Sequence, residues 1–497
     1  MTETPASTPA KEATSSLPPG GLPAWSVADL PPPLPFSFRN AIKTIGPGAI
    51  LLAGSIGGGE WIIGPLTAIK HGAGILWIAS VAVVLQTLFN MEAVRYTMVT
   101  GEPIFTGFMR LRPNSRFWSL FYIAIGIAQL SVPALALGCA GVLFSTAVGR
   151  TPAADDFWPL HYIAYGVIIL GVILLQSGKK VEAVLEWLSW WMVLFIFAFL
   201  IVVNALFVKA EIWQQTLGGF LFFDPAIPRD MDLILLAAFA ATAGSGGLGN
   251  LAVSNWYRDK GFGMGQRMGS IAGMLESHET PLRPIGFQPP DNAENRSRWR
   301  HWWKYAICDQ AVLWGPGCLI GMLLNVNIAM SIIPRENAAE FMSQANVVAG
   351  AFQAHHLADK IWSGFWYLTL LNGFWILFST HLGNTDVLVR TIVDICWTSS
   401  PRARRGSAGR LYTLVLAVLT VWGLIAVNMG DVLQLFTVLA VVANPVLAIG
   451  AVQILLVNRR FLPREMQPPW WRQLALVLVA IAYSLVTAAV LYDKFLK

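Results

Sequence analysis

The sequence predicts an all-α polytopic membrane protein that crosses the bilayer about eleven times, and three observations support this fold class. The first is composition: 55% of the 497 residues are hydrophobic and 12% are charged, so much of the chain must face lipid. The second is a set of apolar runs with the length of a transmembrane helix. The third is a pair of glycine-rich breaks, one in each half of the chain, which is typical of transporters built from inverted repeats.

Eleven apolar runs are long enough to span the bilayer, allowing for the two that glycines interrupt. They cover residues 43–69, 73–97, 117–148, 160–178, 187–208, 232–256, 305–333, 361–397, 411–428, 431–457 and 473–492. With the N-terminus in the cytosol, 25 of the 34 Lys and Arg residues fall on the inner side and eight on the outer side. Cytosolic loops carry such an excess, so we expect a cytosolic N-terminus and a multi-pass protein of the plasma or inner membrane. These loops account for the net charge of +6, and no nucleic-acid partner is expected.

Two polar segments lie outside the apolar runs. Residues 1–42 are rich in Pro, Ser, Thr and Ala and lack a continuous apolar segment next to a basic start, so we expect a disordered cytosolic tail instead of a signal peptide. Residues 257–304 contain several prolines and end in a basic and aromatic cluster. We expect an extended cytosolic loop whose end rests on anionic headgroups, with a regulatory binding loop as the alternative.

The two glycine-rich segments are the strongest indication of function. The first, from Gly54 to Trp61, lies in the run 43–69, and the second, from Ala243 to Asn250, lies in the run 232–256. Each Gly costs a helix about 1 kcal/mol relative to Ala, so both helices are expected to open near the middle of the membrane. Paired discontinuous helices form the substrate site of secondary transporters with inverted repeats. The sequence therefore predicts a site where the two segments meet.

Several motifs resemble those of the Nramp divalent-metal transporters, which share the leucine-transporter type of fold. Gly46-Pro47-Gly48 leads, after eight residues, into Gly57-Gly58-Gly59-Glu60-Trp61, with the spacing at which the family's GPG precedes its DPGNW motif. Further similarity lies in Leu85-Gln86, Val99-Thr100-Gly101, Gly383-Asn384-Thr385, Asn444-Pro445 and Asn458-Arg459-Arg460. The resemblance implies a five-plus-five inverted repeat and one extra helix, with residues 43–208 and 209–457 as the repeats and 458–497 as the eleventh helix.

The metal ligands of the family are not kept in this chain. By the same alignment the family's metal-binding Asp falls on Gly57 and its Asn on Glu60, while the Met and His of the sixth-helix MPH motif fall on Gly247 and Gly249. A thioether ligand helps to select Mn and Fe over hard ions, so the reason to expect that selectivity is absent. What remains is a roomier site with one carboxylate. Such a site suits a hard, partly hydrated cation such as Mg²⁺, and it equally suits an organic solute.

Glu60 is the first candidate for a ligand. A carboxylate in the middle of a span costs about 2.5–3.5 kcal/mol on insertion scales, so it must face protein or water, and the start of a half-helix favours its charge. The alternative is a helix-start charge without a role in binding. Asn250 is the second candidate metal ligand, and open backbone carbonyls would supply further oxygens, although close packing of small residues is the alternative for the glycines. The predicted substrate-binding residues are Gly57, Gly58, Gly59, Glu60, Gly244, Ser245, Gly246, Gly247, Gly249, Asn250, Asn384 and Asn444.

The eighth apolar run is unusually polar. Its spacing puts Asp386, Arg390 and Asp394 on one helix face, which predicts a buried stripe of ion pairs. The alternative is a proton or counter-ion path in which His381 and Asp386 titrate. Single amides in other runs are expected to link helices by hydrogen bonds. These amides are Asn90, Gln129 and Gln453.

No catalytic motif occurs in the chain, which lacks a P-loop, an HExxH motif and a G-x-S-x-G elbow. The four cysteines lie in or at the ends of apolar runs without a CxxC pair, so neither disulfides nor a metal cluster is expected. We expect neither an enzyme nor a cofactor. The sequence indicates a secondary transporter that moves a cation, such as the hard divalent Mg²⁺, by alternating access. The alternatives are a carrier of a small organic solute, an amino acid or amine, and a non-transporting sensor with a transporter fold.

Overall fold

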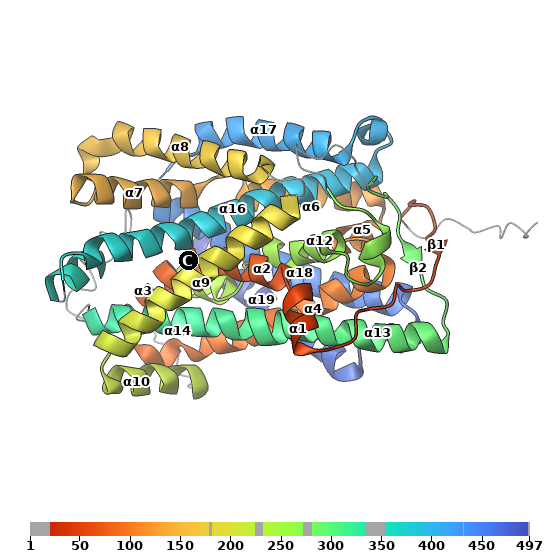
Figure 1. Cartoon of the computed structure of the whole chain (residues 1–497), viewed down its shortest axis with the longest axis horizontal. Coiled ribbons are helices and arrows are strands. Elements are labelled where there is room, and N and C mark those ends of the chain that lie inside the picture. Colours follow the sequence, from red (N-terminus) through yellow and green to blue (C-terminus); the bar gives the residue numbers. More distant parts are fainter. Residues whose placement is uncertain are drawn as a thin grey trace, which may run out of the picture.

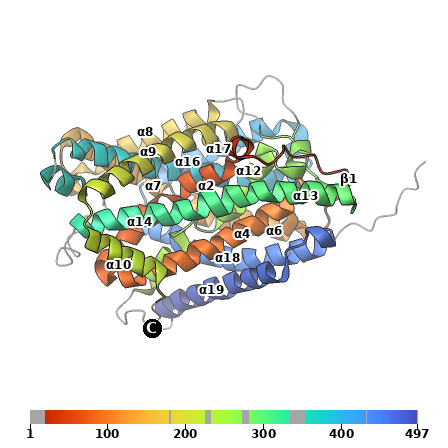
Figure 2. The ribbon, with the colours of Figure 1, turned by 60° about the horizontal axis from the view of Figure 1, so that its bottom comes forward.

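The computed structural model describes residues 20–177, 181–223, 232–271, 281–332, 353–360, 362–430 and 432–495. Long helices run side by side in one bundle, and helices far apart in the sequence, such as α4 (Trp77–Thr100) and α19 (Trp470–Phe495), pack together (Figures 1 and 2). Among the described residues, eight helical stretches are long and apolar enough to cross a membrane, or nine when one bent helix pair counts as a single span. The chain is therefore a helical multi-pass membrane protein, as predicted.

Each predicted apolar run coincides with helix. The first half contains α1 (Phe38–Thr44), α2 (Pro47–Ser55), the π-helix η1 (Gly59–Ile63), α3 (Gly64–His71), α4, α5 (Ile104–Met109), α6 (Ser115–Leu130), α7 (Ala134–Val148), α8 (Phe157–Gln176), α9 (Val181–Phe207) and α10 (Ala210–Leu221). The second half contains α11 (Leu233–Thr242), α12 (Leu248–Lys260), α13 (Ala293–Ala306), the π-helix η5 (Ile307–Trp314), α14 (Gly315–Ile332), α16 (Phe365–Ser399), α17 (Ala408–Ala426), α18 (Val432–Phe461) and α19. Two-residue strands β1 (Ser26–Val27) and β2 (Phe287–Gln288) pair in parallel.

The third predicted run, 117–148, is two helices instead of one. α6 ends at Leu130, and α7 begins at Ala134. Pro133 has no N–H and cannot continue the hydrogen-bond ladder of α6, so the helix is interrupted before it. The sequence predicts one continuous helix for this run, because the hydrophobicity of its residues does not change at the interruption.

The prediction of a disordered tail is wrong for residues 20–42, and residues 1–19 lie outside the described part of the chain. Leu30 is fully buried, its N–H donates to Asn295 Oδ1 at 2.9 Å, and Trp302 Nε1 donates to the Pro31 carbonyl at 2.9 Å. Prolines lack an N–H but keep a carbonyl acceptor, so a proline-rich segment can be held by donors from neighbouring helices. The tail consequently runs as an ordered strap over α13 at one end of the bundle, where Figure 1 shows it in red.

The predicted loop 257–304 is more regular than expected where the structure describes it, and residues 272–280 lie outside that part. α12 extends to Lys260, and α13 begins at Ala293. The basic and aromatic end of the segment forms the first turns of a helix that continues through η5 and α14, with Trp299 and Trp302 buried against protein. The guanidinium of Arg95 lies over the ring of Trp303 at 4.1 Å, a favourable cation–π geometry. Contacts with the protein therefore account for these aromatic residues.

A buried ion pair outside the membrane-spanning helices fixes the same end of the bundle. Arg110 donates two hydrogen bonds to Glu102, and Gly286 N–H donates to Glu102 Oε1 at 3.0 Å. Burial acts to raise the pKa of Glu102, but the charge of Arg110 and these hydrogen bonds outweigh it and lower that pKa. Arg110 also donates to the Pro23 carbonyl at 2.8 Å. The ion pair thus ties the N-terminal strap to the connection between α4 and α5.

Candidate functional site

Both predicted discontinuous helices are interrupted in the structure. The first opens between α2 and η1, whose axes are bent by 40°. The second opens between α11 and α12, where residues 243–247 are not helical. The first interruption is shorter than predicted, because Gly58 already has helical dihedral angles and a π-helical turn follows it. π-helical turns are rare and are often found at functional sites.

The two breaks contact each other through glycine. A Cβ on Gly59 would lie 1.9 Å from the Thr242 carbonyl oxygen, and one on Gly57 would lie 2.1 Å from Thr380 Oγ1. No residue with a Cβ could replace Gly57 or Gly59 without a shift of these neighbouring atoms. In this conformation Gly57 and Gly59 therefore face protein atoms of α11 and α16, so close packing, the alternative raised for the glycines, explains these two.

Two glycines of the second break are needed for its backbone conformation. Gly246 and Gly247 have φ values of +68° and +83°, in the region that L side chains rarely adopt. A Cβ on Gly247 would also meet Ala443 Cα at 2.9 Å, whereas the nearest atom to one on Gly246 is 3.9 Å away. Gly246 thus borders free space, and next to it Ser245 is half-buried.

Two glutamine side chains satisfy the backbone of the second break. Gln86 of α4 donates to the Ala241 carbonyl at 3.1 Å and accepts from Ser245 N–H at 3.1 Å. Gln129 of α6 donates to the Gly246 carbonyl and accepts from Leu248 N–H at 3.2 Å. A primary amide has a donor and an acceptor, so it replaces both partners that an interrupted helix loses. From the sequence, Gln129 was predicted only to link helices, and Gln86 was noted only in a motif. A single amide in an apolar run is the sequence signal that could have indicated this role for both.

Glu60 lies in the first turn of η1 and is fully buried. Its Oε2 accepts a long hydrogen bond of 3.3 Å from Gly57 N–H, and its Oε1 has no hydrogen-bond partner among the described residues. A buried carboxylate oxygen without a partner is costly, and an added cation would satisfy it. The carboxylate therefore fits a cation ligand. The described residues contain no group of three or more His, Cys, Asp or Glu side chains that could hold a metal ion, so backbone or water oxygens would have to complete a shell.

Two of the three predicted asparagine ligands, Asn250 and Asn444, have structural partners. Asn250 Oδ1 accepts from Gly247 N–H at 2.9 Å, and its Nδ2 donates to Asn90 Oδ1 at 2.9 Å. Asn444 Nδ2 donates to the Ala237 carbonyl at 3.2 Å, while its Oδ1 has no partner within the described chain. Asn250 thus holds the second break in shape, and Asn444 ties α18 to α11.

A chain of hydrogen bonds connects the second break to the start of the first broken helix. From Asn90 the chain continues to Gln310 Oε1 at 3.1 Å, and Gln310 Nε2 donates to Asp309 Oδ2 at 2.9 Å. Asp309 Oδ1 accepts from Gly46 N–H at 3.0 Å, at the N-terminus of α2. Both Gln310 and Asp309 belong to η5. The two broken spans are therefore joined by buried polar contacts as well as by packing.

The polar residues of α16 separate into two groups. Asp386, Arg390 and Asp394 form a buried network in which Arg390 bonds Asp386 at 2.9 Å and pairs with Asp259, and Arg258 pairs with Asp394. This is the ion-pair stripe that the spacing predicted, extended by two charged residues of α12. His381 is not part of the network. Its imidazole, like Asn384, lines a cavity on another side of α16.

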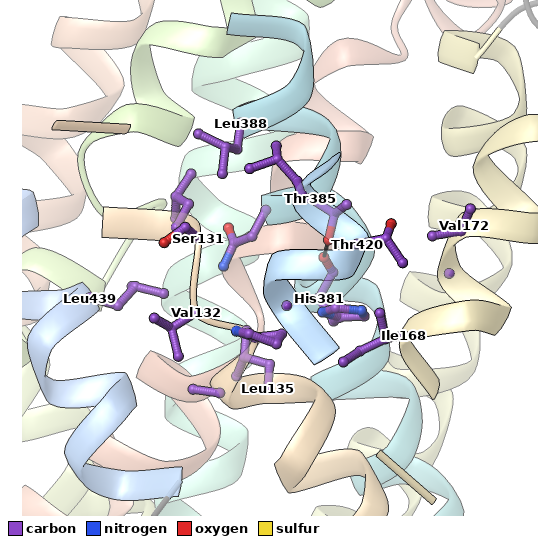
Figure 3. Close-up of a pocket in the computed structure, with 17 residues that line it drawn as sticks. Ser131, Val132, Leu135, Ile168, Val172, His381, Thr385, Leu388, Thr420 and Leu439 are labelled. Atoms are coloured by element: carbon purple, nitrogen blue, oxygen red, sulfur yellow. Dashed lines mark hydrogen bonds between the residues drawn. The ribbon is translucent and has the colours of Figure 1, made fainter. Parts of the chain in front are cut away.

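The cavity has a volume of ≈ 50 Å³ and lies between the α6–α7 interruption, α8, α16, α17 and α18. His381 and the hydroxyls of Ser131, Thr385 and Thr420 lie around the same space (Figure 3). Asn384, Thr385 and Ser131 are half-buried. A cavity of this volume holds a few water molecules.

Comparison with known proteins supports the fold. No protein-family model matches the sequence, and no curated protein matches it either. A solved structure of a single-residue variant of the Eremococcus coleocola manganese transporter aligns over 94% of this chain and 90% of its own, with a TM-score of 0.63 and 12% identity. The same transporter in complex with an aromatic bis-isothiourea substituted compound gives a TM-score of 0.62 and 13% identity over the same shares.

The chain is thus a multi-pass membrane protein with the leucine-transporter type of fold that the sequence motifs predicted. It shares this fold with the manganese transporter over nearly its whole length. At 12% identity the likeness applies to the fold alone, and the cargo has to be inferred from the residues of this chain.

Proposed function

We propose that the protein is a secondary transporter that carries a metal cation across the membrane, with Glu60 as its charged ligand. The observation that carries the proposal is the buried Glu60 carboxylate, which lies beside the contact between two interrupted spans and has one oxygen without a partner in the described part of the chain. An interrupted pair of spans can rearrange around a bound ion, which is the basis of alternating access in such folds. The manganese transporter with the same fold supports a divalent metal ion as cargo.

We further propose a hard divalent ion such as Mg²⁺ as the cargo. Glu60 supplies a carboxylate, and backbone carbonyls of the second break that do not accept from Gln86 or Gln129 would supply further oxygens. Mg²⁺ is bound in proteins by one or two carboxylates and keeps several waters, so such a sparse set of ligands suffices. The residues at the positions of the family's Met and His are Gly247 and Gly249, which offer neither a thioether nor an imidazole.

Uptake into proteoliposomes tests the proposal. We expect Mg²⁺ uptake by the wild-type protein, and Mn²⁺ should gain no large advantage beyond the usual affinity order for oxygen ligands. Glu60→Gln keeps the shape of the side chain and removes its charge, so uptake should fall about tenfold or more, the loss expected for one charged ligand. Glu211→Gln, at an exposed position of α10, is the matched control and should transport normally.

Normal uptake by the Glu60→Gln variant would show that Glu60 is structural and that the site is misassigned. Tight Mn²⁺ binding that excess Mg²⁺ does not displace would show that a soft ligand is present instead.

A small organic cation such as an amine is the second candidate cargo. The observation in its favour is free space at the breaks: a Cβ on Gly54 would meet no atom within 4 Å, and Gly54 is half-buried in α2. Gly54→Ala adds one methyl group there without strain. It should shift the size preference among organic amines if they are the cargo, whereas uptake of a metal ion should stay nearly unchanged.

A further inference from the structure

Oxygen acceptors line the cavity of Figure 3, and they include a backbone carbonyl as well as side-chain oxygens. Pro133 has no N–H, and the Ala134 N–H donates to the Val132 carbonyl at 2.9 Å. The carbonyl of Leu130, which would accept from Ala134 in a continuous helix, therefore has no helical partner. Leu130 and Ser131 both line the cavity. The interruption of the third span thus leaves a backbone acceptor at this place.

The hydroxyl groups around the cavity also act as acceptors. Thr385 Oγ1 donates its proton to the His381 carbonyl at 2.8 Å, and Thr420 Oγ1 donates to the Leu416 carbonyl at 2.7 Å. Each hydroxyl has a single proton, so only lone pairs remain for the cavity. The side chains of Ser131 and Asn384 have no hydrogen bond to any described residue, and each offers an oxygen. Ser131, Asn384 and His381 can also donate, but the oxygens of Thr385 and Thr420 can only accept, so a ligand that binds them must bring positive charge or hydrogen-bond donors.

We propose that this cavity binds an alkali cation, with Na⁺ as the ion to be tested, at a site separate from Glu60. Interrupted membrane helices coordinate Na⁺ through their free carbonyls, and neutral hydroxyl and amide oxygens complete such shells. None of the described residues that line the cavity is Asp, Glu, Lys or Arg, so they leave the double charge of Mg²⁺ uncompensated. A volume of ≈ 50 Å³ admits an ion with some of its water but is far below the 300 Å³ or so of a typical organic-ligand pocket.

The site gives the protein a second ligand besides its cargo. His381 is 6% exposed, and its ring has no hydrogen-bond partner among the described residues. The cavity touches α6, α7, α16, α17 and α18, and a Cβ built on Gly383 of α16 would lie 3.5 Å from Gly54 Cα of α2. An ion that binds here therefore stabilises the helices that surround the broken span α2.

A thermal unfolding assay of the purified full-length protein, without added divalent ions, tests the proposal. NaCl should raise the melting temperature in a saturable way, and choline chloride at equal ionic strength should not. Thr385→Val keeps the shape and removes one oxygen, so the Na⁺ concentration for half of the effect should rise about tenfold, the factor for one ligand worth about 1.4 kcal/mol. Thr487→Val in α19 is the matched control, because it loses the same kind of bond to a carbonyl four residues earlier and lies outside the cavity.

Binding of ²²Na⁺ to the wild-type protein gives a measurement that does not depend on any variant. Unlabelled NaCl should displace the bound tracer, and choline chloride should not. Ser131→Ala is the second variant if Thr385→Val does not fold. Equal responses to NaCl and choline chloride, or an unchanged Na⁺ affinity in the cavity variants, would overturn the proposal. A failure of Mg²⁺ uptake would refute the proposed cargo and would leave Na⁺ binding in place.

Discussion

The two broken spans reach a similar geometry through different uses of glycine. In the first break, Gly57 and Gly59 have ordinary backbone conformations and are needed because neighbouring atoms leave no room for a Cβ. In the second break, Gly246 and Gly247 are needed because the chain turns through dihedral angles that other residues avoid. The first break is held by packing, and the second is held by hydrogen bonds from Gln86 and Gln129. A run of glycines in a membrane helix therefore does not by itself indicate an open cavity.

The largest effect is expected at the packing contact of the first break. Gly59→Ala places a methyl carbon 1.9 Å from the Thr242 carbonyl, which is backbone and cannot rotate away. Overpacking of this kind typically costs about 1–3 kcal/mol or more, so the melting temperature and the yield of folded protein should drop clearly. Gly54→Ala, one turn earlier with no atom within 4 Å, is the control and should behave like wild type. Equal stability of the two variants would mean that the breaks do not touch.

A smaller effect is expected when a clamp of the second break is removed. Gln86→Leu is close in size and leaves the Ser245 N–H and the Ala241 carbonyl without their partner. Each buried unsatisfied group costs about 1–3 kcal/mol, so thermal unfolding should shift to lower temperature and uptake should fall. A wild-type melting curve for Gln86→Leu would show that water replaces the clamp.

The smallest loss of stability is expected for a substitution that strains only the backbone conformation. Gly246→Ala meets no atom closer than 3.9 Å, so its cost comes from a φ of +68°. The left-handed region costs an L residue about 1–2 kcal/mol. Gly247→Ala carries the same strain and also meets Ala443 Cα at 2.9 Å, so it should be the less stable of the two in a thermal unfolding assay. The reverse order would indicate that the second break is governed by packing, like the first.

Much of the fold was predictable because lipid imposes a simple rule on sequence. A helix must hide its backbone polar groups and expose apolar side chains, so the apolar runs, their order and the two main breaks can be read directly. The interruption at Pro133 was missed because a single proline does not lower the hydrophobicity of its run. The strap of residues 20–42 was missed because composition cannot show that Trp302 and Asn295 supply its hydrogen bonds.

The sequence by itself determined the class of protein, the places of the two main breaks and the presence of one carboxylate, Glu60, in the first break. It could not determine which polar atoms at those places are already satisfied, because the partners come from helices distant in the chain. Only the tertiary structure decided that Asn250 is occupied by Gly247 and Asn90, whereas one oxygen of Glu60 has no partner among the residues described. It also decided that His381 and Asp386, five residues apart on α16, lie in a cavity and in an ion-pair network respectively. The physical reason is that binding capacity depends on unpaired polar atoms, and pairing is a property of packed helices.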